Sequence, residues 1–219
     1  MKKLNWQNIE TVLLDMDGTL LDLHFDNYFW LHYVPESYAK KNNITFEQAH
    51  LELMNRYQKV EGTMQWYCVD YWSEELGLDI ALLKEQVAHL IQVHPHVLDF
   101  LEQLKMDGKK RVLVTNAHQK SLSLKMRKTP LAEHLDVIIS AHELGLPKEE
   151  IGFWQQLQSI VSYNPKTTLL VEDNVNILRS AQKYGIKHHL AILKPDSKQE
   201  KKIINEFEAV HDFGELLAN

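Results

Sequence analysis

Cysteine is nearly absent from this chain of 219 residues, which contains only Cys68. A single cysteine excludes an intrachain disulfide and a zinc site built from cysteines, and it fits a reducing compartment. No apolar run approaches the roughly 20 residues of a membrane span. No long apolar stretch follows Lys2 and Lys3, so we expect no signal peptide. We therefore predict a cytoplasmic protein without membrane contact.

An excess of positive charge is also lacking. The chain has 24 basic and 30 acidic residues, which gives a net charge of −6 at pH 7. This balance does not attract nucleic acid, so we predict no nucleic-acid partner. The sequence contains no internal repeat or low-complexity tract, and it indicates no protein partner. The remaining composition is that of an ordinary globular protein, with 44% hydrophobic and 25% charged residues.

Three short apolar runs are each followed at once by polar residues. Runs rich in Val and Leu without alternation are typical of parallel strands that are buried on both faces. Ligands of α/β proteins bind at the carboxyl ends of such strands, so we expect the three polar clusters to form one site. The runs are 11–14 before Asp15, 112–114 before Thr115 and Asn116, and 168–171 before Glu172 and Asp173.

Helical patterns alternate with strand patterns in the second half of the chain. The helical patterns lie at 97–106, 150–161 and 174–184, and weaker strand patterns lie at 137–139 and 189–193. Strands that alternate with helices indicate a parallel sheet with right-handed crossovers. The sequence therefore predicts an α/β fold with a Rossmann-like parallel sheet.

The segment between the first strand and the helix at 97 contains no convincing strand pattern. Thr45 and Gln48 form a capping-box pattern at the start of one of its helices. We predict an all-helical cap domain, 23–93, inserted into an α/β core domain made of 1–22 and 94–219. The predicted cap helices are 27–41, 45–59, 63–76 and 80–93.

The strongest chemical signal follows the first apolar run, in the sequence Asp-Met-Asp-Gly-Thr-Leu-Leu-Asp at 15–22. Asp15 and Asp17 are two residues apart, so their side chains leave the strand end in the same direction. Gly18 permits a sharp turn there. Two nearby carboxylates repel each other unless a cation lies with them or one is protonated. The pattern therefore favours a cation site or an acid–base pair over a solvated turn.

This sequence resembles the first motif of the haloacid dehalogenase superfamily of phosphatases. Thr115 and Asn116 are similar to the second motif, and Lys148 in Gly-Leu-Pro-Lys resembles the third. Glu172 and Asp173 resemble the fourth. The third motif usually has a proline after its lysine, whereas here Pro147 precedes it. The fourth motif lacks its usual downstream acid, with Asn176 in that neighbourhood.

The resemblance implies a Mg²⁺-dependent phosphatase that acts on a small phosphate monoester. It makes Asp15 the nucleophile that forms an aspartyl-phosphate and Asp17 the general acid and base. Lys148 would offset charge, and Thr115 and Asn116 would hold phosphoryl oxygens. The ligands of Mg²⁺ would be Asp15, the main-chain carbonyl of Asp17, and the Glu172–Asp173 pair, whose division stays open.

The cap sequence is dense in aromatic residues, with polar residues among them. Rings that stack a base beside polar groups that read its edges suit a nucleotide, although packing alone explains such rings equally well. The strings around 15–30, 66–73 and 115–118 resemble the bacterial GMP/IMP 5′-nucleotidase branch of the superfamily, which implies a purine nucleotide as substrate. The predicted substrate contacts are Asp26, Asn27, Trp66, Tyr67, Asp70 and His118.

Three alternatives remain open. A phosphatase of sugar or glycolate phosphates would keep the catalytic core, and the aromatic residues of the cap would then not contact a base. A phosphomutase would need a cap that excludes water from the intermediate. A binding domain without activity is expected to have lost one of Asp15, Asp17, Lys148 or Asp173, and all four are present.

Overall fold

The computed structural model describes residues 4–217, so Lys2 and Lys3 lie outside the described part. Six strands form one sheet in the order β3-β2-β1-β4-β5-β6, and every neighbouring pair is parallel. The predicted α/β fold with a parallel sheet is therefore confirmed, and β6 is a strand that the sequence did not predict. The strands are β1 (Thr11–Leu14), β2 (Lys110–Thr115), β3 (Val137–Ser140), β4 (Thr168–Glu172), β5 (His188–Ile192) and β6 (Glu208–Val210).

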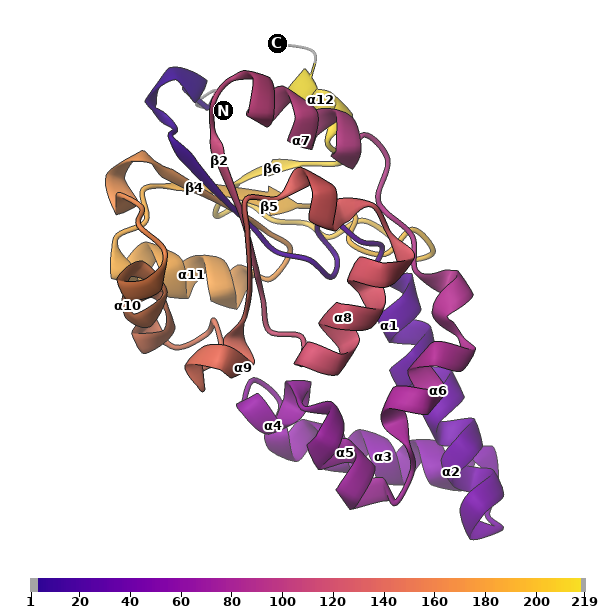
Figure 1. The fold of residues 1–219 in the computed structure, drawn as a ribbon. Helices are drawn as coiled ribbons and strands as arrows, with labels where there is room; N and C mark the ends of the chain where they lie inside the picture. Colours follow the sequence, from indigo (N-terminus) through magenta and orange to yellow (C-terminus); the bar gives the residue numbers. More distant parts are fainter. Residues whose placement is uncertain (1–3, 218–219) are drawn as a thin grey trace.

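Helices cover both faces of this sheet, and a second group of helices lies apart from it (Figure 1). The helices that follow the insertion are α7 (Val97–Met106), α8 (Gln119–Lys128), α9 (Ala141–Leu144), α10 (Ile151–Ile160), α11 (Val175–Tyr184) and α12 (Gly214–Leu217). The helices between β1 and α7 are α1 (His24–Tyr28), α2 (Val34–Asn42), α3 (Phe46–Val60), α4 (Met64–Tyr67), α5 (Val69–Leu76) and α6 (Ile80–Gln86).

The central strand β1 is fully buried because it faces a hydrophobic layer on each side. Successive side chains of a strand point to opposite faces. Val12 and Leu14 accordingly pack in the cluster that contains α7 and α8, whereas Leu13 packs in the cluster that contains α10 and α11. This two-sided burial explains why the strand sequence is apolar without alternation.

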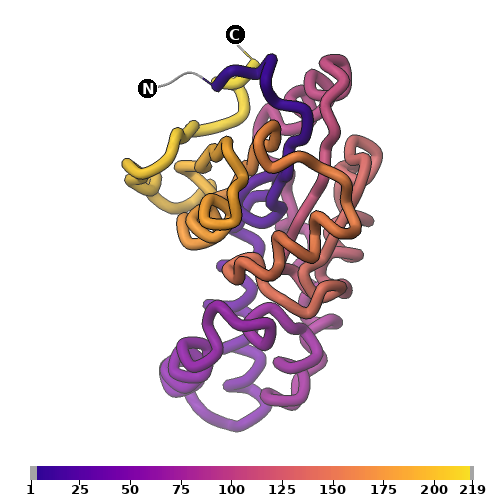
Figure 2. The backbone as a smooth tube through the Cα atoms, turned by 90° about the vertical axis from the view of Figure 1, so that its left-hand side faces the viewer, coloured from indigo at the N-terminus to yellow at the C-terminus, as the bar shows by residue number. Residues whose placement is uncertain are grey.

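The six inserted helices, which we call the cap, lie beyond the carboxyl end of β1, at the opposite end of the molecule from both termini (Figure 2). The chain leaves and re-enters the sheet region through two adjacent segments. Leu21 forms an antiparallel bridge with Val93, and the His94 N–H donates to the Leu20 carbonyl at 3.0 Å. The beginning and the end of the cap are therefore hydrogen-bonded to each other.

The cap helices differ in their bounds from the predicted ones. The predicted capping box is confirmed, with Thr45 and Gln48 bonded reciprocally at the start of α3. The predicted helix at 63–76 is divided at Cys68, whose backbone is extended and whose Sγ accepts the Tyr71 N–H to start α5. The predicted helix at 80–93 ends at Gln86, and a 3₁₀ turn follows. The first cap helix begins three residues earlier than predicted, at His24.

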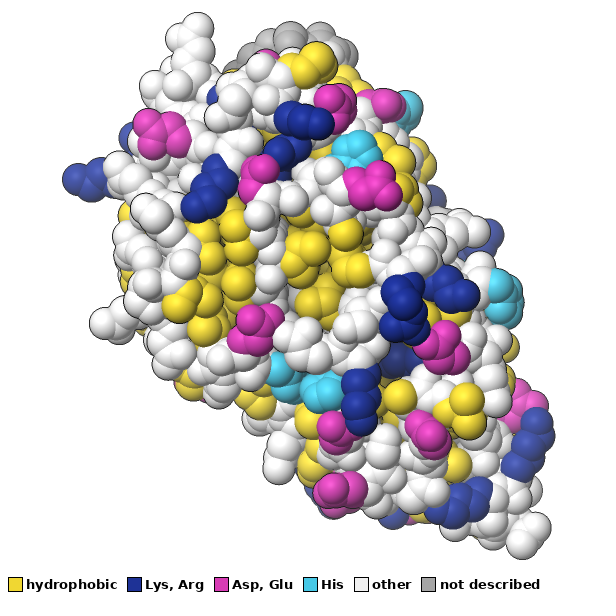
Figure 3. All heavy atoms as spheres, viewed as in Figure 1, with side chains coloured by type: hydrophobic (Ala, Val, Ile, Leu, Met, Phe, Trp, Pro, Cys, Tyr) yellow, Lys and Arg dark blue, Asp and Glu magenta, His cyan; other side chains and the backbone are white. Residues whose placement is uncertain are grey.

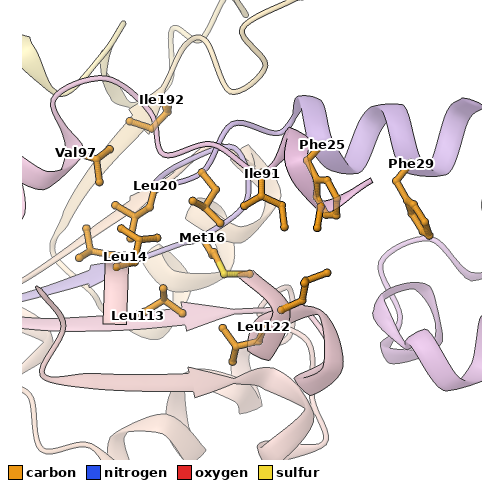
Figure 4. Packing of buried hydrophobic residues seen from close by; sticks show 14 of the residues in the cluster. Leu14, Met16, Leu20, Phe25, Phe29, Ile91, Val97, Leu113, Leu122 and Ile192 are labelled. Carbon is orange, nitrogen blue, oxygen red and sulfur yellow. The ribbon is translucent and has the colours of Figure 1, made fainter. Parts of the chain in front are cut away.

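One hydrophobic cluster runs from the sheet into the cap beside the two crossing segments (Figure 4). Phe25 from α1 and Ile91 from the returning chain belong to it together with Leu122 of α8 and Met16 after β1. Phe25 is 1% exposed. Within residues 4–217, no helix combines the length and the apolar character that crossing a membrane requires.

Candidate active site

The order of the strands in the sheet brings the three predicted polar clusters together. β1 lies between β2 and β4, and Leu14 is in register with Leu113 on one side and Val171 on the other. Asp15, Thr115 and Glu172 therefore lie at the carboxyl ends of three neighbouring strands. All three are buried.

Lys148 joins two of these strand ends. Its Nζ lies 2.5 Å from Asp15 Oδ1 and 2.7 Å from Glu172 Oε2, and it also donates to the Val114 carbonyl at 3.0 Å. The side chain is only 1% exposed. Burial opposes the charge of Lys148, but the two carboxylates outweigh it and raise the pKa of the lysine. The structure thus places this lysine at the site, although Pro147 precedes it.

Gly18 allows the loop after β1 to approach Asp173 closely. Its φ of +87° lies in the region that favours glycine, and a Cβ added there would lie 2.9 Å from the Asp173 carboxyl carbon. Asp173 also accepts a hydrogen bond from Lys202 Nζ at 2.7 Å. The turn after β1 and the end of β4 are therefore packed against each other beside the acidic cluster of Asp15, Glu172 and Asp173.

Carboxylate oxygens of Asp15, Glu172 and Asp173 all lie within 4.8 Å of one another. Burial is the main cause that raises the pKa of both Asp15 and Glu172, and Asp173 adds to it. When all three carboxylates are ionised, Lys148 and Lys202 leave one negative charge of this cluster uncompensated. Hard oxygen donors with excess negative charge are the set that Mg²⁺ prefers, so these residues fit the ion that the sequence predicted.

Asp17 is held by a chain of ionic contacts that leads into the cap. Lys125 Nζ of α8 lies 2.6 Å from Asp17 Oδ1 and 2.6 Å from Asp26 Oδ2, and Lys84 Nζ lies 2.8 Å from Asp26 Oδ1. Burial raises the pKa of Asp17 to about 7, although Lys125 opposes the change. Burial also acts to raise the pKa of Asp26, but its two lysines outweigh this and lower it to about 2.

Asn116 and Tyr67 meet at one carboxylate. The Tyr67 hydroxyl, from the cap, donates to Glu149 Oε1 at 2.6 Å, and Asn116 Nδ2 donates to Glu149 Oε2 at 2.9 Å. Asn116 Oδ1 accepts the Lys148 N–H at 2.9 Å, which orients the loop that carries the buried lysine. The Thr115 hydroxyl oxygen accepts the Ala117 N–H at 3.0 Å.

A cavity of about 550 Å³ lies between the strand ends and the cap. Its lining includes the acidic cluster, Lys148 and Asn116 from the sheet side, but Thr115 is not part of it. Of the predicted substrate contacts, those that line the cavity are Asp26, Asn27, Trp66, Tyr67 and His118.

Asp70 lies away from this cavity. It is bonded to Lys120 of α8 at 2.5 Å and lies 3.7 Å from His118 Nε2. Asp70 and Lys120 are about half exposed. Figure 3 shows histidine, lysine and acidic side chains gathered along this boundary between the cap and the rest of the molecule. Asp70 thus connects two parts of the chain rather than facing the cavity.

The sequence did not single out the three lysines that pair with the site carboxylates: Lys84, Lys125 and Lys202. Lys125 belongs to α8, a helix that the sequence did not predict. The buried face of α8 contains Ser121 and Lys125 besides Leu122 and Leu124, so its apolar residues do not recur at helical spacing. A buried polar position on a helix gives no pattern that distinguishes it from a solvated one.

The fold and site define a hydrolase: the chain belongs to the haloacid dehalogenase-like hydrolase family, whose sequence profile matches residues 12–191. It is 41% identical over 212 residues to the GMP/IMP nucleotidase YrfG of Escherichia coli (strain K12), which covers 97% of this chain and 96% of that protein. Pyrophosphatase PpaX of Bacillus mycoides (strain KBAB4) is 22% identical over 188 residues, with 82% and 81% covered.

Among solved structures, a HAD phosphatase from Thermococcus onnurineus has the same fold. The TM-score is 0.80 at 21% identity, and the match covers 96% of this chain and 97% of that one. The superfamily predicted from the four motifs is therefore confirmed.

Proposed function

We propose that this protein is a Mg²⁺-dependent phosphatase of nucleoside 5′-monophosphates, with GMP and IMP as preferred substrates. The observation that carries the proposal is Lys148 Nζ, which joins Asp15 and Glu172 at the base of a cavity with aromatic side chains on its cap side. The similarity to a GMP/IMP nucleotidase over nearly the whole chain supports the substrate class.

Asp15 is the nucleophile in this proposal. A carboxylate oxygen attacks phosphorus, the bond from phosphorus to the ester oxygen breaks, and an aspartyl-phosphate forms. Asp17 donates its proton to the departing ribose oxygen. Asp17 then removes a proton from water, which attacks the phosphorus and releases phosphate and Asp15. The raised pKa of Asp17, near 7, supports both the donating and the accepting role.

Mg²⁺ supplies the positive charge that lets an anionic nucleophile approach an anionic phosphate. We assign its ligands to Asp15, Asp173 and the main-chain carbonyl of Asp17. Glu172 has both oxygens engaged, one with Lys148 and the other with the Asp173 and Asn174 N–H groups. We therefore assign Glu172 to holding Lys148 and the Asp173 loop rather than to direct ligation.

The Asn116 main-chain N–H would hold a phosphoryl oxygen, and Lys148, whose three donors bond Asp15, Glu172 and the Val114 carbonyl, would offset charge. The Thr115 hydroxyl lies outside the cavity lining and accepts the Ala117 N–H, so its predicted contact with phosphate stays a prediction. The side chain of Asn116 is already fixed by Glu149 and the Lys148 N–H, which favours its main chain for the contact with phosphate. We also propose that 23–93 form a cap domain and that 1–22 with 94–219 form the core domain. A cytoplasmic location and the lack of macromolecular partners stay predictions.

The test is phosphate release from GMP, IMP, AMP, UMP, phosphoglycolate and hexose phosphates, with Mg²⁺ and with EDTA. Release that requires Mg²⁺ and is fastest with GMP and IMP is the expected result. Fastest release from a sugar or glycolate phosphate would contradict the nucleotidase assignment while keeping the phosphatase. Release that EDTA does not change would contradict the metal assignment.

Asp15→Asn tests the nucleophile directly. We expect turnover to fall by about 10³-fold or more, as is usual when a nucleophile is removed. Lys148 keeps its bond to Glu172 in this variant, so the fold should be preserved. Without Mg²⁺ the variant should unfold at a temperature no lower than wild type, because a buried negative charge is removed. Turnover above one-tenth of wild type would rule out Asp15 as nucleophile.

A further inference from the structure

Besides Tyr67 and Asp26, whose polar atoms are bonded to Glu149 and Lys125, the cap side of the cavity has a wall of three aromatic side chains and one further carboxylate. Trp30, Tyr57 and Trp66 line it, with ring centroids 5.7 Å apart for both the Trp30–Tyr57 and the Tyr57–Trp66 pair. The indole N–H groups of both tryptophans have no hydrogen-bond partner among residues 4–217. Glu61 completes this wall, one helical turn after Tyr57.

Glu61 differs from every other carboxylate that lines the cavity. The others have an ammonium partner: Asp15 and Glu172 pair with Lys148, Asp173 with Lys202, and Asp17 and Asp26 with Lys125. Glu61 has neither an ion pair nor a hydrogen bond to any residue within the described range 4–217. Its charge is therefore available to a ligand.

The position of Glu61 in the chain is unfavourable for local stability. It is the C-cap residue of α3, where the helix dipole presents its negative end. Gly62 follows with a φ of +76° and turns the chain toward α4, which carries Trp66. A carboxylate at a helix C-terminus gains nothing from the helix, so the fold itself gives no reason for an acid at this position.

We propose that Glu61 is the residue that selects 6-oxopurines, by accepting hydrogen bonds from the base while the aromatic wall stacks on it. Guanine offers its N1–H and its 2-amino group to a carboxylate, and hypoxanthine offers its N1–H. Adenine has a lone pair at N1, which would meet the oxygen lone pairs of Glu61. The 6-carbonyl of the accepted bases is an acceptor that the indole N–H groups suit.

This inference rests on the proposed nucleotidase function and adds the part that explains base preference. Stacking on aromatic rings tolerates every base, so the wall alone would not distinguish GMP from AMP. Glu61 is exposed in this structure, so its discrimination comes from the direct meeting of its oxygen lone pairs with a donor on the accepted bases or with the N1 lone pair of adenine. Discrimination at N1 therefore needs an acceptor such as Glu61.

The test compares wild type with Glu61→Gln, using kcat/KM for GMP, IMP, AMP and ribose 5-phosphate. The Gln side chain keeps the size and can donate to adenine N1. We expect the preference for GMP over AMP to fall by about tenfold to a hundredfold, as is typical for a hydrogen bond to a charged group. The loss should appear mainly in KM, since the base is remote from the reacting phosphorus. Ribose 5-phosphate, which has no base, should be unaffected.

Glu74→Gln is the matched control. Glu74 is an exposed cap carboxylate outside the cavity lining, so its removal should leave all four substrates unchanged. An unchanged ratio of GMP to AMP in Glu61→Gln would overturn the role of Glu61 while the nucleotidase function stands. An equal fall with all four substrates would also overturn it, because the effect would then not depend on the base. Wild type without preference for nucleotides over ribose 5-phosphate would instead overturn the proposed function.

Discussion

The cap contacts the core in two different ways on its two sides. Beside the crossing segments, Phe25 and Ile91 of the inserted segment share one buried apolar cluster with Leu122. On the side of α4 and α5, two polar pairs join the cap to the core, Tyr67 with Glu149 and Asp70 with Lys120, and the partly buried Met64 is the apolar contact beside them. Figure 1 shows α4 and α5 on the far side of the cap from the crossing at α1.

This difference indicates where the cap can separate from the core. Apolar burial is lost in full when the surfaces part, whereas polar groups that separate can bond to water at a small net cost. The side next to the crossing should therefore stay closed while the polar side opens to admit substrate. We expect the cap to move about the crossing segments, with Tyr67 and Asp70 moving furthest from their partners.

Phe25→Ala should have the largest effect on stability. The side chain is fully buried, so its removal should lower the free energy of unfolding by about 3–5 kcal/mol. Urea unfolding followed by fluorescence measures this change. Leu51→Ala is the control, because Leu51 is 66% exposed and should cost little. A loss below about 1 kcal/mol for Phe25→Ala would mean that the apolar side does not hold the cap.

Lys125→Met should have the next largest effect, on turnover rather than on stability. Asp26 keeps Lys84 in this variant, but Asp17 loses the contact that positions it. We expect kcat with GMP to fall by roughly tenfold to a hundredfold, part of the full contribution of an acid–base group. An aryl phosphate should be less affected, because its leaving group needs no proton.

Lys128→Met is the matched control for this measurement. Lys128 lies on the same helix but is exposed, and no contact with the site involves it. Its kcat should equal that of wild type. Equal losses on GMP and on the aryl phosphate in Lys125→Met would show that Lys125 does not act through Asp17.

Tyr67→Phe should have a smaller effect on the polar side. It removes the bond to Glu149, which keeps its bond from Asn116, so stability should fall by about 1 kcal/mol. KM for GMP should rise because the closed cap is held less firmly. Tyr71→Phe is the control, since no residue in the described range 4–217 accepts a bond from the Tyr71 hydroxyl. An unchanged KM in Tyr67→Phe would show that the bond from Tyr67 to Glu149 does not hold the cap closed.

Lys120→Ala should have the smallest effect of the four. Its pair with Asp70 is about half exposed, and such pairs contribute little and are screened by salt. We expect no measurable change in the urea midpoint and a KM close to wild type at high salt. A large change in stability that persists in salt would show that the polar side holds the cap as firmly as the apolar side.

The sequence predicted those site residues that lie at the ends of strands. Asp15 and Asp173 directly follow β1 and β4, and Glu172 is the last residue of β4, so the strand pattern was enough to bring them together. Lys125 and Lys202 reach the site from distant segments, and their pairing depends on tertiary contacts that no local pattern reports. Because Lys125 occupies a buried position of α8, the apolar residues of this helix do not recur at helical spacing, and the helix was not predicted.

The predicted bounds of the cap helices were wrong for a related reason. Cys68 interrupts an apolar period that continues on both sides of it, so the sequence indicated one helix where the chain has two. The three-residue strand β6 was missed because it is too short to display a period. Periodicity predicts which segments are ordered better than it predicts where they turn.

The bridge between Leu21 and Val93 makes the cap a replaceable unit. Residues bridged in this way lie roughly 4.5–5.5 Å apart, a gap that a hairpin loop of a few residues closes. A chimaera that exchanges the segment between these two positions would keep the sheet and its carboxylates intact. The donor segment must supply a buried apolar residue in place of Phe25 and a carboxylate in place of Asp26 to pair with Lys125. A chimaera that meets this requirement keeps the catalytic residues of the sheet and acquires the substrate range of the donor cap.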